Sequence, residues 1–398
     1  MAFAEPEGRT QVGIVGAGPA GLLLAHLLHQ QGIDSVVLER HSRGYVEERV
    51  RAGVLEQNTV DLLIEADVGE RMRQEGLVHH GIEIRFDGEG HRIALTELSG
   101  GRSITVYGQQ KVVRDLIDAR QGYGGPLHFE AEVTELGDLD GEQPWLRYSL
   151  DGNMHTLRCD FIAGCDGFHG VSRPAIPADR VQVFERAYPH GWVGILAEVA
   201  PSTEELIYAY HDRGFALHSL RSPTLSRLYV QCDADDELDN WPDERVWEEL
   251  HARLARNDGW TLKEGPVVEK TLARMHAFVI EPMQYGRLFL AGDAAHIVPP
   301  TGAKGLNLAV ADIRHLSRAL IAHYKQGRDG LLEGYSKACL PRIWRAQQFT
   351  SWMTRMLHPD RSDDAFRKRL QRAELEYLAR SERARMTLAE NYVGMPEL

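Results

Sequence analysis

The 398-residue chain has few cysteines and no long apolar run. Its four cysteines have no metal-ligand spacing and are too sparse for a disulfide framework, so we expect reduced thiols, a cytoplasmic location and no metal site. The first ten residues lack the apolar stretch of a signal peptide. The longest apolar stretch, Leu22 to Leu28, is far too short to cross a bilayer, so we expect no membrane partner. The cysteines are Cys159, Cys165, Cys232 and Cys339.

Basic residues are also scarce. The chain has 45 Lys and Arg against 58 Asp and Glu, which gives a formal net charge of −13. This balance disfavours binding to nucleic acids and to acidic membrane surfaces. A local cluster of basic side chains is therefore needed if the ligand is an anion. The sequence has no internal repeats, and its length predicts two or three domains with a well-buried core.

A glycine-rich turn near the start lies in the context of a βαβ unit. Residues 11–15 and 34–38 are typical of short buried strands, and residues 19–31 of an apolar helix between them. The turn reads Gly16-Ala-Gly18-Pro-Ala20-Gly21, which is the G-x-G-x-x-G pattern of a dinucleotide site with a right-handed crossover. The alternative is an ordinary glycine-rich turn, but the complete strand–turn–helix–strand context favours the dinucleotide site.

Each residue of this pattern has a physical role. Gly16 allows the tight turn, Gly18 lets the backbone approach a pyrophosphate, and Gly21 lets helix and strand pack closely. The phosphates then meet free N–H groups and the positive end of the helix dipole. Glu39 ends the second strand, where a carboxylate accepts hydrogen bonds from the two ribose hydroxyls of an adenosine.

A second glycine–acid pair, Gly292-Asp293, ends the apolar strand predicted over 286–291. Asp293 at that edge is placed to bind a ribityl hydroxyl, which extends the predicted ligand to FAD. A proline-stiffened loop follows, and a helix is predicted from Gly305 onward. The positive N-terminus of this helix would face the flavin ring and stabilise its anionic reduced form. Residues 158–167 are predicted as another strand, running into an Asp-Gly turn.

A polar hairpin is predicted further along the chain. Residues 214–221 alternate in a way that places Leu217, Ser219 and Arg221 on one face of a strand, and a Ser-Pro-Thr turn leads into a returning strand with Tyr229. A guanidinium and two hydroxyls suit a carboxylate ligand. From the residues alone, an ordinary sheet with polar outer side chains remains the alternative.

These fingerprints, in this order, resemble those of the class A flavoprotein aromatic hydroxylases. The matching runs extend well beyond what a shared FAD fold requires, and they cover nearly the whole chain. The resemblance implies a mixed α/β (α+β) fold, with a Rossmann-like FAD-binding domain of the glutathione-reductase type, an inserted sheet-rich substrate domain and a helical C-terminal tail. The matching runs are residues 49–57, 106–109, 164–170 and 390–394 and the Pro299-Pro300 loop.

The resemblance also predicts domain boundaries. Residues 1–77, 102–184 and 275–350 would form the FAD-binding domain, and residues 78–101 and 185–274 the substrate-binding domain. Residues 351–398 would form a helical interface region. That region would supply a surface for a homodimer.

The resemblance assigns roles to residues at matching positions. The FAD contacts would come from Gly16, Gly18, Ala20, Gly21, Glu39, Arg49, Arg51, Gly53, Val54, Gln109, Asp293, Leu306 and Asn307. The carboxylate of an aromatic acid would be held by Ser219, Arg221 and Tyr229, beside Thr301. Tyr208 and Tyr392 would relay the proton of the substrate hydroxyl, with His79 as the outlet to solvent, and Pro300 would offer its carbonyl to that hydroxyl. The apolar walls would be Trp192, Leu206, Val54 and Leu217.

The sequence has no second dinucleotide motif for a nicotinamide cofactor. The resemblance implies a surface groove lined by Arg40, His41, Arg43, Tyr45, His169 and Arg173, whose basic character favours NADPH, with NADH also possible. Three residues depart from the family pattern as we know it. His41 stands in place of a glutamine, His276 in place of an arginine, and Tyr210 in place of a smaller amide residue.

The activity implied is the hydroxylation of 4-hydroxybenzoate at its 3-position, with NADPH and O2, through a flavin hydroperoxide. Three alternatives stay open. The chain would hydroxylate a related benzoate, such as 4-aminobenzoate or 3,4-dihydroxybenzoate; it would be a flavin reductase that inserts no oxygen; or it would be a non-catalytic sensor of aromatic acids. A sensor needs no exit for a proton, so the two relay tyrosines argue against the last of these.

Overall fold

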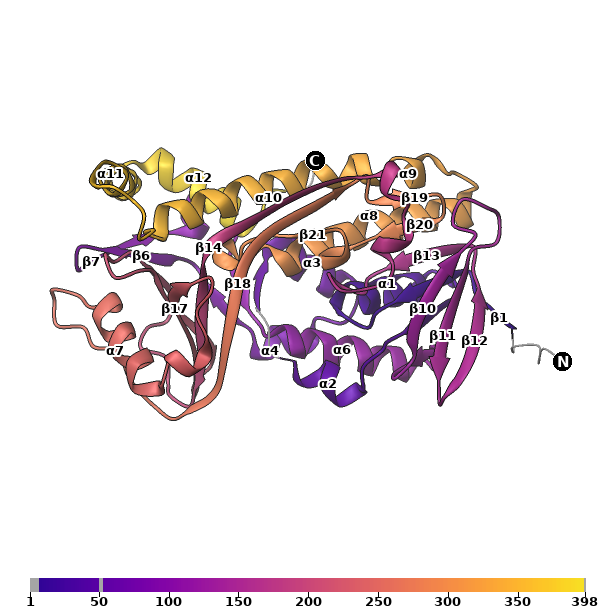
Figure 1. Ribbon diagram of the computed structural model, residues 1–398, viewed down its shortest axis with the longest axis horizontal. Helices are drawn as coiled ribbons and strands as arrows, with labels where there is room; N and C mark the ends of the chain where they lie inside the picture. The colour runs from indigo at the N-terminus through magenta and orange to yellow at the C-terminus, as the bar shows by residue number, and fades with distance from the viewer. Residues whose placement is uncertain (1–6, 50–52, 397–398) are drawn as a thin grey trace.

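The computed structural model describes residues 7–49 and 53–396 (Figure 1). A six-stranded, mostly parallel sheet lies at one end of the molecule, and three of its strands carry the predicted nucleotide motifs. Its spatial order is β19 (Gln284–Tyr285), β20 (Leu288–Leu290), β13 (Phe161–Gly164), β2 (Val12–Val15), β3 (Ser35–Leu38) and β9 (Leu127–His128). The predicted βαβ unit is confirmed, with α1 (Pro19–Gln30) between β2 and β3.

Helices pack on this sheet through apolar faces. Leu22, Leu23 and Leu24 are fully buried because the start of α1 is apolar on nearly every side. The predicted helix from Gly305 is confirmed as α8, and Ile313 and Leu316 bury its inner face. The other helices of this region are α2 (Arg43–Glu48), α3 (Gln57–Glu65), α4 (Glu70–Glu75), α6 (Gln109–Gly122), α8 (Gly305–Gln326) and α9 (Gly330–Glu333).

Two smaller sheets flank the nucleotide-binding region. One prediction is wrong here, because residues 158–167 do not form a single strand. Arg158 ends β12 in a four-stranded sheet, and β13 begins in the six-stranded sheet only at Phe161. The four-stranded sheet contains β1 (Glu7–Arg9), β12 (Asn153–Arg158), β11 (Trp145–Leu150) and β10 (Glu132–Gly137), and the three-stranded sheet contains β4 (Val54–Glu56), β8 (Ile104–Val106) and β5 (Leu77–His79).

An eight-stranded sheet forms the other end of the molecule (Figure 1). Its long strands β14 and β18 run antiparallel to one another and reach from this sheet to the nucleotide-binding region. The predicted hairpin is confirmed as β16 and β17, with Leu217 opposite Tyr229 and Ser219 opposite Arg227. The spatial order is β21 (His296–Ile297), β18 (Val267–Glu281), β14 (Gln182–Ala197), β17 (Leu225–Asp233), β16 (Ala216–Ser222), β15 (Leu206–Ala209), β6 (Ile82–Phe86) and β7 (Glu89–Ile93).

Each face of this sheet has its own apolar core. On one face, α7 (Asp243–Leu254) packs through Val246 and Leu250. On the other face, aromatic side chains of the sheet meet α5 (Leu95–Leu98) and the C-terminal helices α10 (Tyr335–Leu357), α11 (Ala365–Arg380) and α12 (Glu382–Val393). The C-terminal helices lie along one long edge of the molecule (Figure 1). The predicted domain boundaries at 184/185 and 274/275 fall inside β14 and β18, and the division itself stays a prediction.

A buried ion-pair cluster ties the last helix to the nucleotide-binding region. Lys304 Nζ lies 2.6 Å from Glu56 Oε1 and donates to the carbonyl oxygens of Asn391 and Tyr392, at 2.6 and 3.0 Å. Arg342 Nη2 lies 2.7 Å from the other carboxylate oxygen of Glu56. Burial raises the pKa of Glu56, but the two cations more than offset this and hold the pKa below its ordinary value.

We predict that Glu56→Gln lowers the free energy of unfolding by about 3–5 kcal/mol at neutral pH, because it leaves Lys304 buried without its counter-charge. The carboxylate stabilises the fold above its ordinary pKa, and this contribution is lost as the pH falls through the lowered pKa of the folded state. Urea unfolding of both proteins at pH 7 and at a pH well below 4.5, the ordinary pKa of a glutamate, measures the effect. The gap between them should narrow in acid, and an equal gap at both pH values would refute the ionic role.

Candidate functional site

The first glycine turn has the geometry that a dinucleotide requires. Gly16 has φ of +103°, and a Cβ there would lie 2.5 Å from the Cys165 carbonyl oxygen. A Cβ on Gly21 would lie 2.0 Å from the Gly16 oxygen, so neither position accepts a side chain. A Cβ on Gly18 would meet no heavy atom within 4 Å, although Gly18 caps α1. The open space beside Gly18, at the positive end of α1, fits a pyrophosphate. Ala20 is buried in the first turn of the helix.

Glu39 lies at the end of β3 and is buried. Its Oε2 accepts the Ala17 N–H at 2.8 Å, and its Oε1 accepts the His41 N–H at 2.9 Å. These two bonds fix the carboxylate against the glycine turn. A carboxylate has about four lone-pair positions, so capacity remains for the hydroxyls of a ribose.

The second glycine–acid pair lies beside α8. Gly292 has φ of +62° and begins the short 3-10 turn Gly292–Ala294, which contains the half-buried Asp293. The N-terminus of α8 follows at Gly305, and Leu306 is half-buried in its first turn. The structure therefore supplies an acid for a ribityl chain and a helix N-terminus for an anionic ring, and the residues present fit FAD.

Asn307 is predicted to contact FAD, and its side chain is engaged within the protein. Its Oδ1 accepts from the Glu56 N–H at 2.9 Å and the Thr59 hydroxyl at 2.8 Å. Its Nδ2 donates to the Val54 and Ala303 carbonyl oxygens, at 3.0 and 2.8 Å. The side chain is fully used in joining β4 to α8. A contact from Asn307 to FAD must therefore come from its backbone N–H.

The remaining predicted FAD residues lie around these motifs. Gly53 is packed so closely that a Cβ would lie 2.7 Å from Gly108 Cα. Gln109 begins α6, and its side chain is half-buried. Arg49 is exposed, with Cζ 5.7 Å from the centre of the Tyr45 ring. Arg51 lies outside the described residues.

The hairpin brings the predicted carboxylate anchor together. Arg221 Nη1 donates to Ser219 Oγ at 2.9 Å and to the Leu220 carbonyl at 2.9 Å, while its buried Nε has no partner among the described residues. Burial lowers the pKa of Arg221, and the hydroxyl of Tyr229 opposes that effect. No described carboxylate forms an ion pair with Arg221, so its charge is available to an anionic ligand.

Arg227 is a neighbour that the sequence analysis left without a role. Its Nε donates to the Tyr229 hydroxyl at 3.2 Å, and its Nη1 lies 2.9 Å from Glu269 Oε1. The guanidinium groups of Arg221 and Arg227 therefore both lie beside the Tyr229 phenol. Among the described ion pairs, only Arg227 has a carboxylate partner, Glu269. The alternation that identified Arg221 also placed Arg227 on the facing strand, and this is the pattern that points to it.

The two predicted relay tyrosines touch one another. Tyr208 from β15 and Tyr392 from α12 place their hydroxyl oxygens 2.5 Å apart. Both side chains are buried, and burial raises the pKa of each phenol. The pair is therefore neutral at neutral pH and able to pass a proton along the hydrogen bond.

His79 is buried rather than placed at the surface as a solvent outlet. It ends β5 at 1% exposure, and neither ring nitrogen has a partner among the described residues. Burial lowers the pKa of His79 to about 4, which keeps the ring neutral. The described hydrogen bonds do not connect it to Tyr392.

The proline loop lies near α10. Pro300 is exposed, and its carbonyl accepts the Ala303 N–H at 3.0 Å, which leaves its second lone pair for another donor. The Thr301 hydroxyl is buried and bonded to the Thr354 hydroxyl at 2.8 Å. Thr301 therefore attaches the loop to α10.

An aromatic stack lines the region behind the anchor. Trp192 Nε1 donates to His358 Nε2 at 2.7 Å, and the ring of Phe215 lies 4.3 Å from that of His358. Because Nε2 accepts, His358 must donate from Nδ1 to the Thr354 carbonyl, 3.0 Å away. Burial lowers the pKa of His358 well below its ordinary value, which agrees with a neutral ring. Leu206 and Leu217, two of the predicted apolar walls, lie in the same hydrophobic core as Trp192 and Phe215. His358 was not predicted from the sequence.

The nicotinamide candidates form two groups. Arg40 Nε donates to His41 Nε2 at 3.2 Å, and the rings of His41 and Tyr45 lie 4.1 Å apart. Arg173 lies over the rings of Phe168 and Phe278, at 4.4 and 4.7 Å. The remaining candidates are His169, which is exposed, and Arg43, which pairs with Glu47. His276, which stands where the family pattern has an arginine, packs on Phe168.

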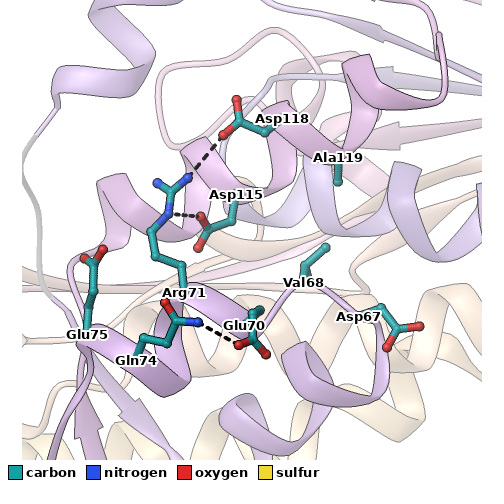
Figure 2. Close-up of a pocket in the computed structure, with 9 residues that line it drawn as sticks. All are labelled: Asp67, Val68, Glu70, Arg71, Gln74, Glu75, Asp115, Asp118 and Ala119. Atoms are coloured by element: carbon teal, nitrogen blue, oxygen red, sulfur yellow. Dashed lines mark hydrogen bonds and ion pairs between the residues drawn. The ribbon is translucent and has the colours of Figure 1, made fainter.

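A surface depression lies beside Arg43, whose Nη2 is 3.8 Å from Asp118 in its lining. Figure 2 shows it between α4 and α6, where Arg71 points toward Asp115 and Asp118. Arg71 Nε lies 3.2 Å from Asp115, and its Nη2 lies 3.3 Å from Asp118. None of the predicted site residues lines this depression.

In the part of the chain that the structure describes, no helix is long and apolar enough to cross a membrane. Within residues 7–49 and 53–396, no group of three or more His, Cys, Asp or Glu side chains is arranged to hold a metal ion.

Known proteins share this sequence and fold. The family profile described as FAD binding domain matches residues 9–350. A p-hydroxybenzoate hydroxylase of Acinetobacter baylyi is 48% identical over 388 residues, covering 98% of this chain and 96% of the relative. The aklavinone 12-hydroxylase of Streptomyces purpurascens is 26% identical over 363 residues, and the alignment spans 64% of its length.

The fold is also found in solved structures. The p-nitrophenol 4-monooxygenase of Pseudomonas putida superimposes with a TM-score of 0.85 at 21% identity, over 98% of this chain and 100% of that protein. At this identity the match concerns the fold. The chain belongs to the FAD-binding family of flavoprotein monooxygenases.

Proposed function

We propose that this protein hydroxylates 4-hydroxybenzoate at its 3-position, using FAD, NADPH and O2. The observation that carries the proposal is Arg221, a half-buried guanidinium with no carboxylate partner among the described ion pairs, which lies on the same sheet as Tyr208 of the Tyr208–Tyr392 hydroxyl pair. A para-substituted phenol with a carboxylate matches these two features. The 48% identity with a p-hydroxybenzoate hydroxylase supports the same substrate.

The side chains divide the work. Arg221, Ser219 and Tyr229 bind and orient the carboxylate through charge-assisted hydrogen bonds. The Tyr208 hydroxyl takes up the proton of the substrate hydroxyl as Tyr208 passes its own to Tyr392. His79 is the next acceptor, and the Pro300 carbonyl orients the hydroxyl.

Removal of that proton makes the ring carbon ortho to the oxygen a much stronger nucleophile. Bound FAD supplies the redox chemistry, taking hydride from the nicotinamide and activating O2 toward that carbon. The aromatic stack around Trp192 and His358 excludes water from the ring. Loss of this seal would divert activated oxygen to peroxide.

NADPH is the proposed reductant, with NADH as the alternative. Arg40, His41 and Tyr45 form one exposed group, and Arg173 with His169 forms another. Guanidinium groups bind a 2′-phosphate in bidentate fashion, which favours the phosphorylated cofactor.

We predict that Arg221→Ala weakens 4-hydroxybenzoate binding by roughly 2–4 kcal/mol, because it removes a buried charge partner. Equilibrium titration of the holoenzyme, followed by the flavin spectrum, measures the dissociation constant. Arg147→Ala, in the four-stranded sheet, is the matched control and should bind normally. Unchanged affinity in Arg221→Ala would reject the anchor.

We predict that Tyr208→Phe slows hydroxylation and raises the share of NADPH that ends as peroxide, because the substrate proton loses its first acceptor. Product and peroxide are quantified together for a panel of benzoates. Hydroxylation of a substrate with an amino group needs no phenolate, so the turnover and coupling of 4-aminobenzoate should change little in this variant. Full coupling of 4-hydroxybenzoate turnover in the variant would argue against the relay.

A homodimer is the proposed assembly, with α11 at its centre. Phe366, Leu370 and Tyr377 lie on one face of this helix and are 72%, 47% and 63% exposed. The first half of α11 carries basic residues and the second half acidic ones. Two copies packed antiparallel about a twofold axis would place the basic half of each against the acidic half of the other. The basic residues of the first half are Arg367, Lys368, Arg369 and Arg372, and the second half carries Glu374 and Glu376, with Arg380 at its end.

We predict that the double variant Phe366→Ser, Tyr377→Ser is monomeric while the unchanged protein is dimeric, because the apolar stripe on α11 is lost. Sedimentation velocity gives the mass of each. Met154→Ser, which removes an exposed apolar side chain from β12, is the control and should stay dimeric. A dimer that survives the double change would place the interface elsewhere.

A further inference from the structure

A buried ion pair lies directly behind the Gly292-Asp293 turn. Asp312 Oδ2, on α8, lies 2.6 Å from His296 Nε2 and accepts the Gly292 N–H at 2.9 Å. The two side chains are 1% and 2% exposed. One carboxylate oxygen thus holds both ends of the segment that carries Asp293.

The rest of this segment is fixed by its backbone. The Ala295 N–H donates to the Gly292 carbonyl at 2.8 Å, and the Ile280 N–H donates to the Ala295 carbonyl at 3.0 Å. His296 and Ile297 form β21, which pairs with β18. Gly292 has a left-handed φ of +62°, which glycine adopts without the Cβ clash that other residues meet, so the backbone turns sharply at the start of this segment.

The pair is ionic. Burial lowers the pKa of His296, but Asp312 overcomes this effect and raises the pKa above its ordinary value, with a further contribution from Asp293. An isolated charge in this position would cost several kcal/mol, whereas each member here neutralises the other. A stable fold does not require charges at this depth. We therefore attribute the pair to the need to hold the Gly292–Asp293 turn in one place.

The position of Asp312 on α8 shows what the pair holds the turn against. It lies seven residues after Gly305, which is two helical turns, or about 10 Å along the axis. The helix is therefore a rigid spacer. Its N-terminus would face the flavin ring of bound FAD, and Asp312 holds the turn that carries Asp293, the acid proposed for the ribityl chain.

We infer that His296 and Asp312 are positioning residues for the flavin half of FAD. They set where the Asp293 carboxylate lies relative to the N-terminus of α8, and they act through the turn without touching the cofactor. The adenosine half, which rests on the Gly16–Gly21 turn and Glu39, is independent of them. The inference goes beyond the proposed substrate and depends on FAD binding alone.

The test compares FAD with ADP, which occupies the adenosine half alone. Apoprotein of the Asp312→Asn variant is titrated with each ligand by fluorescence and calorimetry. FAD should bind at least tenfold more weakly than to the unchanged apoprotein, and ADP should bind within twofold. The midpoint potential of the bound flavin should also shift, since Asp293 and the helix N-terminus change their relative placement.

Glu249→Gln in α7 is the matched control, because it breaks another buried pair, Glu249 with Arg253 at 2.8 Å, far from the glycine turns in the sequence. It should lower stability while leaving FAD affinity and potential unchanged. His296→Gln, whose amide still donates to Asp312, serves if Asp312→Asn fails to fold, and it should show a smaller loss in the same direction. Equal loss of FAD and ADP binding, or unchanged FAD binding, would overturn the inference.

Discussion

The hydrogen bond between the Tyr208 and Tyr392 hydroxyls is the contact on which the rest of the site depends. It joins a strand of the eight-stranded sheet to the last helix, 184 residues apart in sequence. The sheet also presents Arg221, and the last helix is held by Lys304 beside the start of α8. One contact therefore relates the proposed carboxylate anchor, the proposed proton path and the helix proposed to face the flavin.

Charge is distributed unevenly between the surface and these contacts. The chain carries a net charge of −13, yet Arg221 and Lys304 bring positive charge into the interior at the site, and His296 does so beside Asp312. Lys304 and His296 are neutralised by Glu56 and Asp312. Arg221 differs from them because no described carboxylate pairs with it. An acidic protein can thus bind an acidic ligand through one desolvated cation.

The sequence predicted the parts of the fold that depend on local pattern. The βαβ unit, the hairpin and α8 follow from alternation, helical periodicity and glycine placement over short windows. Contacts across long separations were not predictable: Asn307 and Glu56 meet across 251 residues, and no local pattern indicates that the Asn307 side chain joins β4 to α8. The burial of His79 was likewise hidden, because its neighbours come from other strands.

The guanidinium of Arg221 and the Tyr208–Tyr392 phenol pair are proposed to hold the two ends of one aromatic acid. A crystal structure of the holoenzyme with 4-hydroxybenzoate tests this proposal most directly. We expect the carboxylate to be bound by Arg221, Ser219 and Tyr229, and the phenol oxygen to lie within hydrogen-bonding distance of Tyr208. A ring bound away from Arg221, or reversed so that its carboxylate faces Tyr208, would contradict it.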